Sequence, residues 1–183
     1  MAYVVAVIIG VVFGGVDQYL GSNPSWPVAI AFSLMSAPWL LLPFFVGMTQ
    51  RARRRAIVLG LVVTVAALVG YGLMIIGPLQ YHGGRSSFDW VGLRGVMRSQ
   101  MRYLVGGLVT GPLYGYLGHR WRTTRSWLAL ALAGGVLVLE PLTRIAGFET
   151  GAPLAFVLEL VAGATLIACL LGSKIWTSRA TGA

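Results

Sequence analysis

Long apolar runs separated by short polar segments dominate the pattern of this chain. The runs are continuous and lack the strict alternation of a half-buried strand, so they predict helices. Each is close to the ~20 residues with which a helix crosses the ~30 Å hydrocarbon core of a bilayer. We therefore predict six transmembrane spans, over residues 2–20, 27–48, 56–79, 101–118, 126–147 and 153–175. The loops between them are short, so residues 1–183 are predicted to form a single six-helix transmembrane domain.

The longest interval between spans, residues 80–100, carries a helical pattern of its own. Apolar residues recur there at steps of three and four, while arginines recur every four residues on another face. The apolar positions are Trp90, Leu93, Met97, Met101 and Leu104, and the basic ones are Arg94, Arg98 and Arg102. This pattern predicts an amphipathic helix near residues 89–100 that lies on the outer surface and turns into the fourth span. The predicted fold class is thus all-α, a polytopic membrane protein with this outer helix between spans three and four.

Composition agrees with this pattern, because 57% of the residues are hydrophobic and only 10% are charged. Soluble domains carry about 25% charged residues, and a soluble chain this apolar would need more core than roughly 180 residues enclose. Disorder and a disulfide-rich scaffold are excluded on the same grounds. Tryptophans support the span ends, where indoles prefer the headgroup level. Trp26, Trp127 and Trp176 fall there, whereas Trp39 falls inside the second span.

The net charge of +9 is distributed unevenly between the two predicted sides. One side holds nine basic residues and no acid, namely Arg51, Arg53, Arg54, Arg55, Arg120, Arg122, Arg125, Lys174 and Arg179. The other side holds the five remaining arginines and all five acids. The positive-inside rule makes the first side cytoplasmic, so we expect a multi-pass protein of the cell membrane with both termini in the cytoplasm. The expected partner is the lipid bilayer, and nucleic-acid binding is not expected, since no basic face interleaved with stacking aromatics is present.

Small residues recur every four positions in three spans, which makes flat helix faces that allow close packing. These residues are Gly10, Gly14, Gly107, Gly111, Gly115, Ala164, Ala168 and Gly172. Two interpretations remain open, packing within the bundle and docking onto a partner membrane subunit. Prolines 38 and 43 also predict a kink in the second span near residues 36–39.

Charged side chains at one membrane depth form the candidate polar site. At ~1.5 Å per residue, Asp17, Glu140 and Glu159 all fall in the outer third of the bilayer. An unpaired charge in hydrocarbon costs ~2.5–3.5 kcal/mol or more, so these acids need partners or a polar cavity. The candidate site comprises Asp17, Arg98, Arg102, Glu140, Arg144 and Glu159, with Glu140 and Arg144 one turn apart. Three interpretations remain open. The charges form an ion-pair clasp that fixes helix register, they line a cavity for a small-molecule ligand or a proton, or they face lipid and snorkel to the headgroups.

Residues for catalysis or metal binding are lacking in the sequence. The predicted topology separates His82 from His119 by the membrane, and Cys169 lies too deep to join either. No metal site, cofactor or catalytic residue is therefore expected, and the sequence contains neither a nucleophile elbow nor a P-loop. We do not expect an enzyme.

Several segments together resemble a known family. They are residues 36–47 (SAPWLLLPFFVG), 66–72 (AALVGYG) and 111–122 (GPLYGYLGHRWR), with the later Glu140. They are similar to a family of small actinobacterial integral membrane proteins of unknown function, which implies a multi-span protein and supplies no activity. A weaker architectural likeness is to the S components of energy-coupling-factor transporters, six-helix proteins with a solute site in the outer half. Two functions follow as hypotheses, a solute-binding or transport subunit and a non-catalytic structural or accessory subunit.

Overall fold

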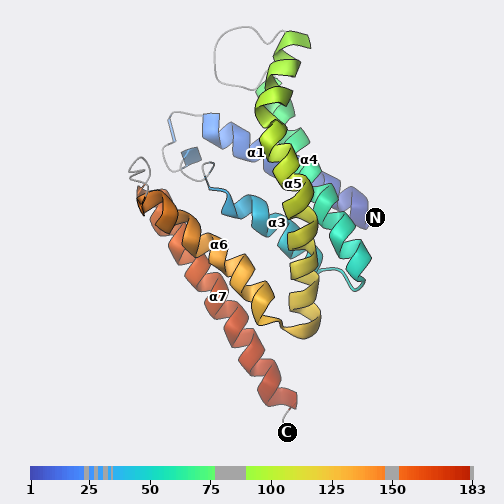
Figure 1. Cartoon of the computed structure of the whole chain (residues 1–183), viewed down its shortest axis with the longest axis vertical. Coiled ribbons are helices and arrows are strands. Elements are labelled where there is room, and N and C mark those ends of the chain that lie inside the picture. The colour runs from blue at the N-terminus through green and yellow to red at the C-terminus, as the bar shows by residue number, and fades with distance from the viewer. Residues whose placement is uncertain are drawn as a thin grey trace.

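The computed structural model describes residues 1–22, 25–26, 29–30, 33, 35–76, 90–146 and 153–181. Its principal elements are α1 (Ala2–Ser22), α3 (Ala37–Met48), α4 (Arg53–Ile76), α5 (Trp90–Thr124), α6 (Trp127–Ala146) and α7 (Pro153–Thr181) (Figure 1). No strand occurs among the residues described. The predicted all-helical class is confirmed, and α6 matches its predicted span to within one residue at each end.

The predicted second span, residues 27–48, is not one continuous helix. The chain bends at Ser36, and α3 begins at Ala37 and has only 12 residues. Pro38 lies in the first turn, where a backbone N–H would have no intrahelical acceptor, so its absence costs nothing. It therefore helps to start α3 instead of kinking a longer helix, and Pro43 alone lies in the helix interior.

The predicted fourth span and the predicted surface helix form a single helix. α5 runs for 35 residues without interruption, about 52 Å at the usual rise per residue. Residues 96–105 contain no proline or glycine that would end a helix. The segment near residues 89–100 is thus the first part of α5, which differs from the separate surface helix that we predicted.

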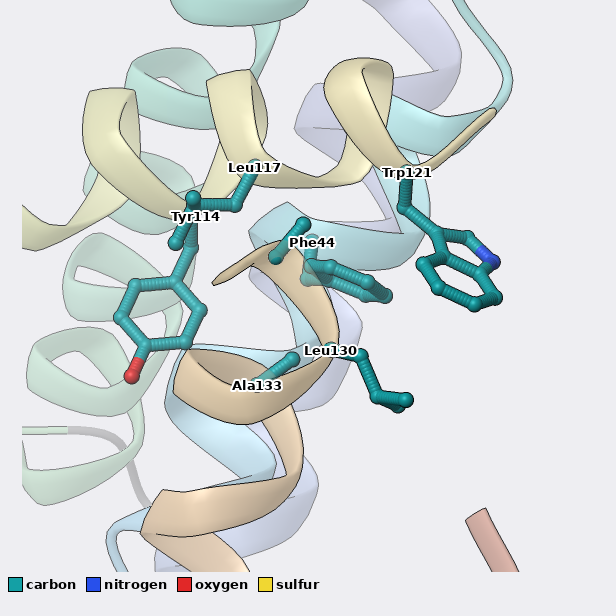
Figure 2. Close-up of a cluster of buried hydrophobic side chains, with 7 residues drawn as sticks. Phe44, Tyr114, Leu117, Trp121, Leu130 and Ala133 are labelled. Carbon is teal, nitrogen blue, oxygen red and sulfur yellow. The ribbon is translucent and has the colours of Figure 1, made fainter. Parts of the chain in front are cut away.

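Helix α4 is the centre of the packing. It contacts α1, α3 and α5, whereas α6 and α7 form an antiparallel pair that reaches the other helices through α3 and α5. Figure 1 shows this pair on the far side of α3 from α1 and α4. Phe44 of α3 is fully buried against side chains of α5 and α6 (Figure 2). That cluster comprises Phe44, Tyr114, Leu117, Trp121, Ala129, Leu130 and Ala133.

Glycines let α4 approach its neighbours closely. A Cβ at Gly10 would lie 2.5 Å from the carbonyl oxygen of Val63, and one at Gly14 would overlap that of Ala67. On the opposite side of α4, a Cβ at Gly115 would lie 2.5 Å from the carbonyl oxygen of Ala56. Real Cβ atoms do not occupy such positions, so the backbones of α1, α4 and α5 pack at distances that only glycine allows.

The third small-residue stripe behaves differently. Ala164, Ala168 and Gly172 of α7 are exposed, and a Cβ at Gly172 would have no heavy atom of the described chain within 4 Å. Packing within the bundle, one of the two interpretations, therefore does not account for these three positions.

The basic residues on α4 and α5 gather at one end of the bundle. The guanidinium of Arg55 lies 6.0 Å from the ring of Tyr3, at the start of α1. At the same end, Arg122 donates to the carbonyl oxygen of Thr49 at 2.7 Å, just after α3. We call this the basic end, defined by the exposed side chains of Arg51, Arg53, Arg54, Arg55, Arg120 and Arg122.

Two helices of the described chain are long and apolar enough to cross a membrane, Ala2–Ser22 and Arg53–Ile75. The shorter apolar helices are Ala37–Met48, Trp127–Leu142 and Phe156–Cys169. Length and composition thus indicate a membrane-associated chain.

Candidate functional site

The candidate site lies around the first turn of α3, at the end of the bundle opposite the basic end. Ser36 occupies the N-cap position of α3, and Trp39 follows in the first turn. Each donates a hydrogen bond to a carboxylate on another helix, Ser36 to Glu140 of α6 and Trp39 to Asp17 of α1. The start of α3 therefore joins two acids that are far apart in the sequence.

Glu140 caps α3 from a different helix. The backbone N–H of Ser36 donates to Oε1 at 3.0 Å and to Oε2 at 3.1 Å. The Ser36 side chain makes no capping hydrogen bond of its own. A helix N-terminus has unsatisfied N–H groups and a partial positive charge, so a carboxylate is favourable there. Glu140 supplies this carboxylate and ties α6 to α3.

Asp17 of α1 is buried, with only 3% of its surface exposed. The indole N–H of Trp39 donates to its Oδ2 at 3.3 Å. Its Oδ1 is buried and accepts no hydrogen bond within the part of the chain that the structure describes. The rings of Phe13 and Tyr71 contact Trp39 edge-on, with centroids 5.4 Å and 5.9 Å away. The carboxyl therefore has one engaged oxygen and lies beside a cluster of three aromatic rings.

Glu159 of α7 is also buried, with 2% of its surface exposed. The position of Glu159 along α7 relative to the residues of α6 follows from the antiparallel packing of these two helices. A Cβ at Gly163 would lie 2.8 Å from Cβ of Leu137, which sets the register of the two helices. One turn further along both helices, this register brings Glu159 level with Pro141, the residue that follows Glu140 in the sequence. The three acids expected at one depth thus lie at the same end of the bundle.

Of the three arginines of the predicted site, only Arg98 has a described side chain. Arg98 is exposed on α5. The side chains of Arg102 and Arg144 lie outside the described residues, so the pairing of Glu140 with Arg144 stays a prediction. The described partners of Asp17 and Glu140 are instead N–H donors on α3.

Sequence reasoning missed Ser36 and Trp39 as parts of this site. Trp39 carried a signal, since it was the tryptophan that did not fit a span end. The N–H of Ser36 carried almost none, because every residue but proline has one. No group of three or more histidine, cysteine, aspartate or glutamate residues that could hold a metal occurs in the described ranges.

Residues 1–182 match a family of unknown function (DUF6518), and the chain belongs to that family. This agrees with the resemblance to an uncharacterised family found in residues 36–47, 66–72 and 111–122. No curated protein and no solved structure matches the chain. The likeness to transporter S components stays a prediction.

Proposed function

We propose that this member of the DUF6518 family is a six-span protein of the cell membrane that binds a small organic cation at Asp17, as a solute-binding or transport subunit. Both termini and the basic end would face the cytoplasm, and Asp17 would lie in the outer half of the bilayer.

Exposed apolar surface, as well as helix length, supports a position of the helices in the membrane. Val4, Ile8 and Val12 follow one face of α1 and are each more than half exposed. Val105 and Val109 do the same on α5. A soluble monomer rarely presents such continuous apolar faces, whereas lipid solvates them without cost. These faces support burial of the bundle in a bilayer.

The buried Oδ1 of Asp17, which accepts no hydrogen bond among the described residues, supports a ligand site at this carboxylate. Asp17 lies about 22 Å along α1 from Ala2, which places it in the outer third of the hydrocarbon core on the proposed topology. Ionisable residues at such depth are rare and commonly mark ligand or ion pathways. A cation bound at Oδ1 would supply the positive counter-charge that a carboxylate needs in the membrane.

The neighbouring rings favour an organic cation over a hydrated metal ion. The π faces of tryptophan, tyrosine and phenylalanine attract quaternary ammonium groups, and aromatic cages with this role recur in proteins. Trp39 contacts both the carboxylate and the other two rings, so charge and aromatic surface meet at one residue. A monovalent cation of small size matches this combination.

Thermal unfolding in detergent tests this function. Tetramethylammonium, tetraethylammonium and tetraphenylphosphonium chlorides serve as probes of graded size, against sodium chloride at equal ionic strength. A ligand that binds the folded state raises Tm with concentration, so we expect at least one probe to do so. The rise should vanish in Asp17→Asn, which preserves size and one oxygen, and persist in Glu140→Gln. No rise with any probe, or an equal rise in Asp17→Asn, would refute the proposal.

A second function is favoured by the bond between Glu140 and Ser36. That carboxylate already has a donor and links α6 to α3, which is what a structural or accessory subunit without ligand requires. In that case Asp17→Asn would change Tm without changing its response to any cation. The same titration therefore separates the two functions.

A further inference from the structure

Two arginines from different helices converge on Tyr116 at the basic end. The guanidinium carbon of Arg53, the first residue of α4, lies 4.8 Å from the centroid of the Tyr116 ring. Arg120 of α5 donates from Nη1 to the hydroxyl oxygen of the same tyrosine at 3.3 Å. One ring thus holds two cations close together, where they repel each other.

No acid compensates this charge within the described chain. The three acidic residues that the structure describes, Asp17, Glu140 and Glu159, all lie at the opposite end. The nearby Arg122 is turned toward the carbonyl oxygens of Met48 and Thr49, so the end of α3 engages it. A guanidinium has five N–H groups, of which Arg120 uses one on the Tyr116 hydroxyl, and Arg53 contacts the ring face. An anion bound by both groups would relieve their repulsion.

We propose that Arg53, Arg120 and Tyr116 bind the phosphate of an anionic phospholipid in the cytoplasmic leaflet. Guanidinium groups match phosphate oxygens with charge-assisted, often bidentate, hydrogen bonds. Tyrosine belongs at the headgroup level of a membrane, and basic pockets between helices on the cytoplasmic side accept anionic headgroups. This site is separate from Asp17 and does not depend on the solute proposed there.

An apolar track on α5 favours a lipid over free phosphate. Val109, Leu113, Tyr116 and Arg120 are spaced by four, three and four residues, so they share one helix face. Val109 is 66% exposed and Leu113 is 45% exposed. This face runs from the two arginines toward the middle of the membrane, along the path of an acyl chain.

Lipid titration of the detergent-purified protein tests the site. Dioleoylphosphatidylglycerol is compared with dioleoylphosphatidylcholine by thermal unfolding and by counting bound lipids in native mass spectrometry. We expect a saturable rise in Tm with phosphatidylglycerol alone. The variant Arg53→Gln with Arg120→Gln should lose this preference, and Tyr116→Phe, which keeps the ring, should lose part of it.

The matched control is Arg51→Gln with Arg54→Gln, which removes the same charge from exposed arginines of the same end. We expect the apparent affinity for phosphatidylglycerol to fall at least about tenfold more in the site variant, because direct phosphate contacts exceed screened long-range attraction. Equal losses in both double variants would show diffuse attraction and refute the site. Equal binding of both lipids would refute it as well, and an equal effect of inorganic phosphate would refute a lipid as its ligand.

Discussion

The backbone N–H of Ser36 donates a bifurcated hydrogen bond to both carboxylate oxygens of Glu140 at the start of α3. The two residues are 104 positions apart in the chain. In a local capping box, a glutamate three residues along the same helix accepts a hydrogen bond from the N-cap N–H. Here the glutamate comes from another helix. The bond therefore starts α3 and also attaches the α6–α7 pair to it.

Replacing Ser36 by proline tests this bond at its donor. The φ angle of Ser36 is −81°, close to the value that proline fixes, so the main loss is the N–H. We expect Ser36→Pro to lower the free energy of unfolding by about 1–3 kcal/mol, because the carboxylate loses the hydrogen bond from this N–H group. Ser36→Ala should stay near the parent, since the serine side chain makes no capping bond. Equal stabilities of the two variants, measured by thermal unfolding in detergent, would contradict this role of Glu140.

The bond between Trp39 and Asp17 predicts energetic coupling. Trp39→Phe keeps an aromatic ring beside Phe13 and Tyr71 but removes the donor to Oδ2. We expect a loss of about 1.5–3 kcal/mol, the range for hydrogen bonds to charged groups. In a double-mutant cycle with Asp17→Leu, the combined loss should be smaller than the sum of the single losses. Strict additivity would show that the indole N–H does not stabilise the carboxyl.

The glycines of α5 should differ sharply in their tolerance of alanine. A Cβ at Gly118 would overlap the carbonyl oxygen of Phe44, whereas one at Gly106 would meet nothing within 4 Å among the described residues. Gly118→Ala forces α3 and α5 apart, and we expect a loss of about 1–3 kcal/mol from overpacking. Gly106→Ala should be neutral or stabilising by up to about 1 kcal/mol, since alanine favours helix. If thermal unfolding ranked the two variants alike, the close packing of α3 on α5 would be wrong.

Cysteine labelling tests the proposed orientation. In a Cys169→Ala background, single cysteines at Arg54 and Thr124 should react with an impermeant maleimide only after cells are permeabilised. A cysteine at Ser25, on the opposite side, should react in intact cells. Ser25 is exposed in the structure, which makes it a suitable reporter. Labelling of positions 54 and 124 from outside would reverse the orientation.

The sequence predicted most helices well because each apolar run also marks where a helix is stable. It predicted α3 poorly, since the apolar run continues through Ser36 while the backbone bends there. Small-residue spacing shows which faces permit close packing, but the partner decides whether they pack. Gly10 and Gly14 meet α4, whereas Ala164 and Ala168 have the same spacing and are exposed.

The acids of the candidate site were found from their depth along the predicted spans, and their partners were not. From the sequence, arginines are the expected partners of carboxylates because their charge is opposite. The described donors are an indole N–H and a backbone N–H, neither of which carries charge. A carboxylate at a helix start needs only oriented dipoles, and their position depends on tertiary structure that spacing alone does not reveal.

The attachment of α6 to α3 has a consequence for biogenesis. Because the chain is made from its N-terminus, the residues of α3 are synthesised long before Glu140. Until then the first turn of α3 lacks its carboxylate, and the N-terminal helices have no contact with the last hairpin. On the proposed topology, a nascent chain that stops before α6 would thus present the start of α3 inside the membrane without this cap. Synthesis of α6 supplies the carboxylate that caps this end, so the start of α3 is completed only when the α6–α7 pair joins the other helices.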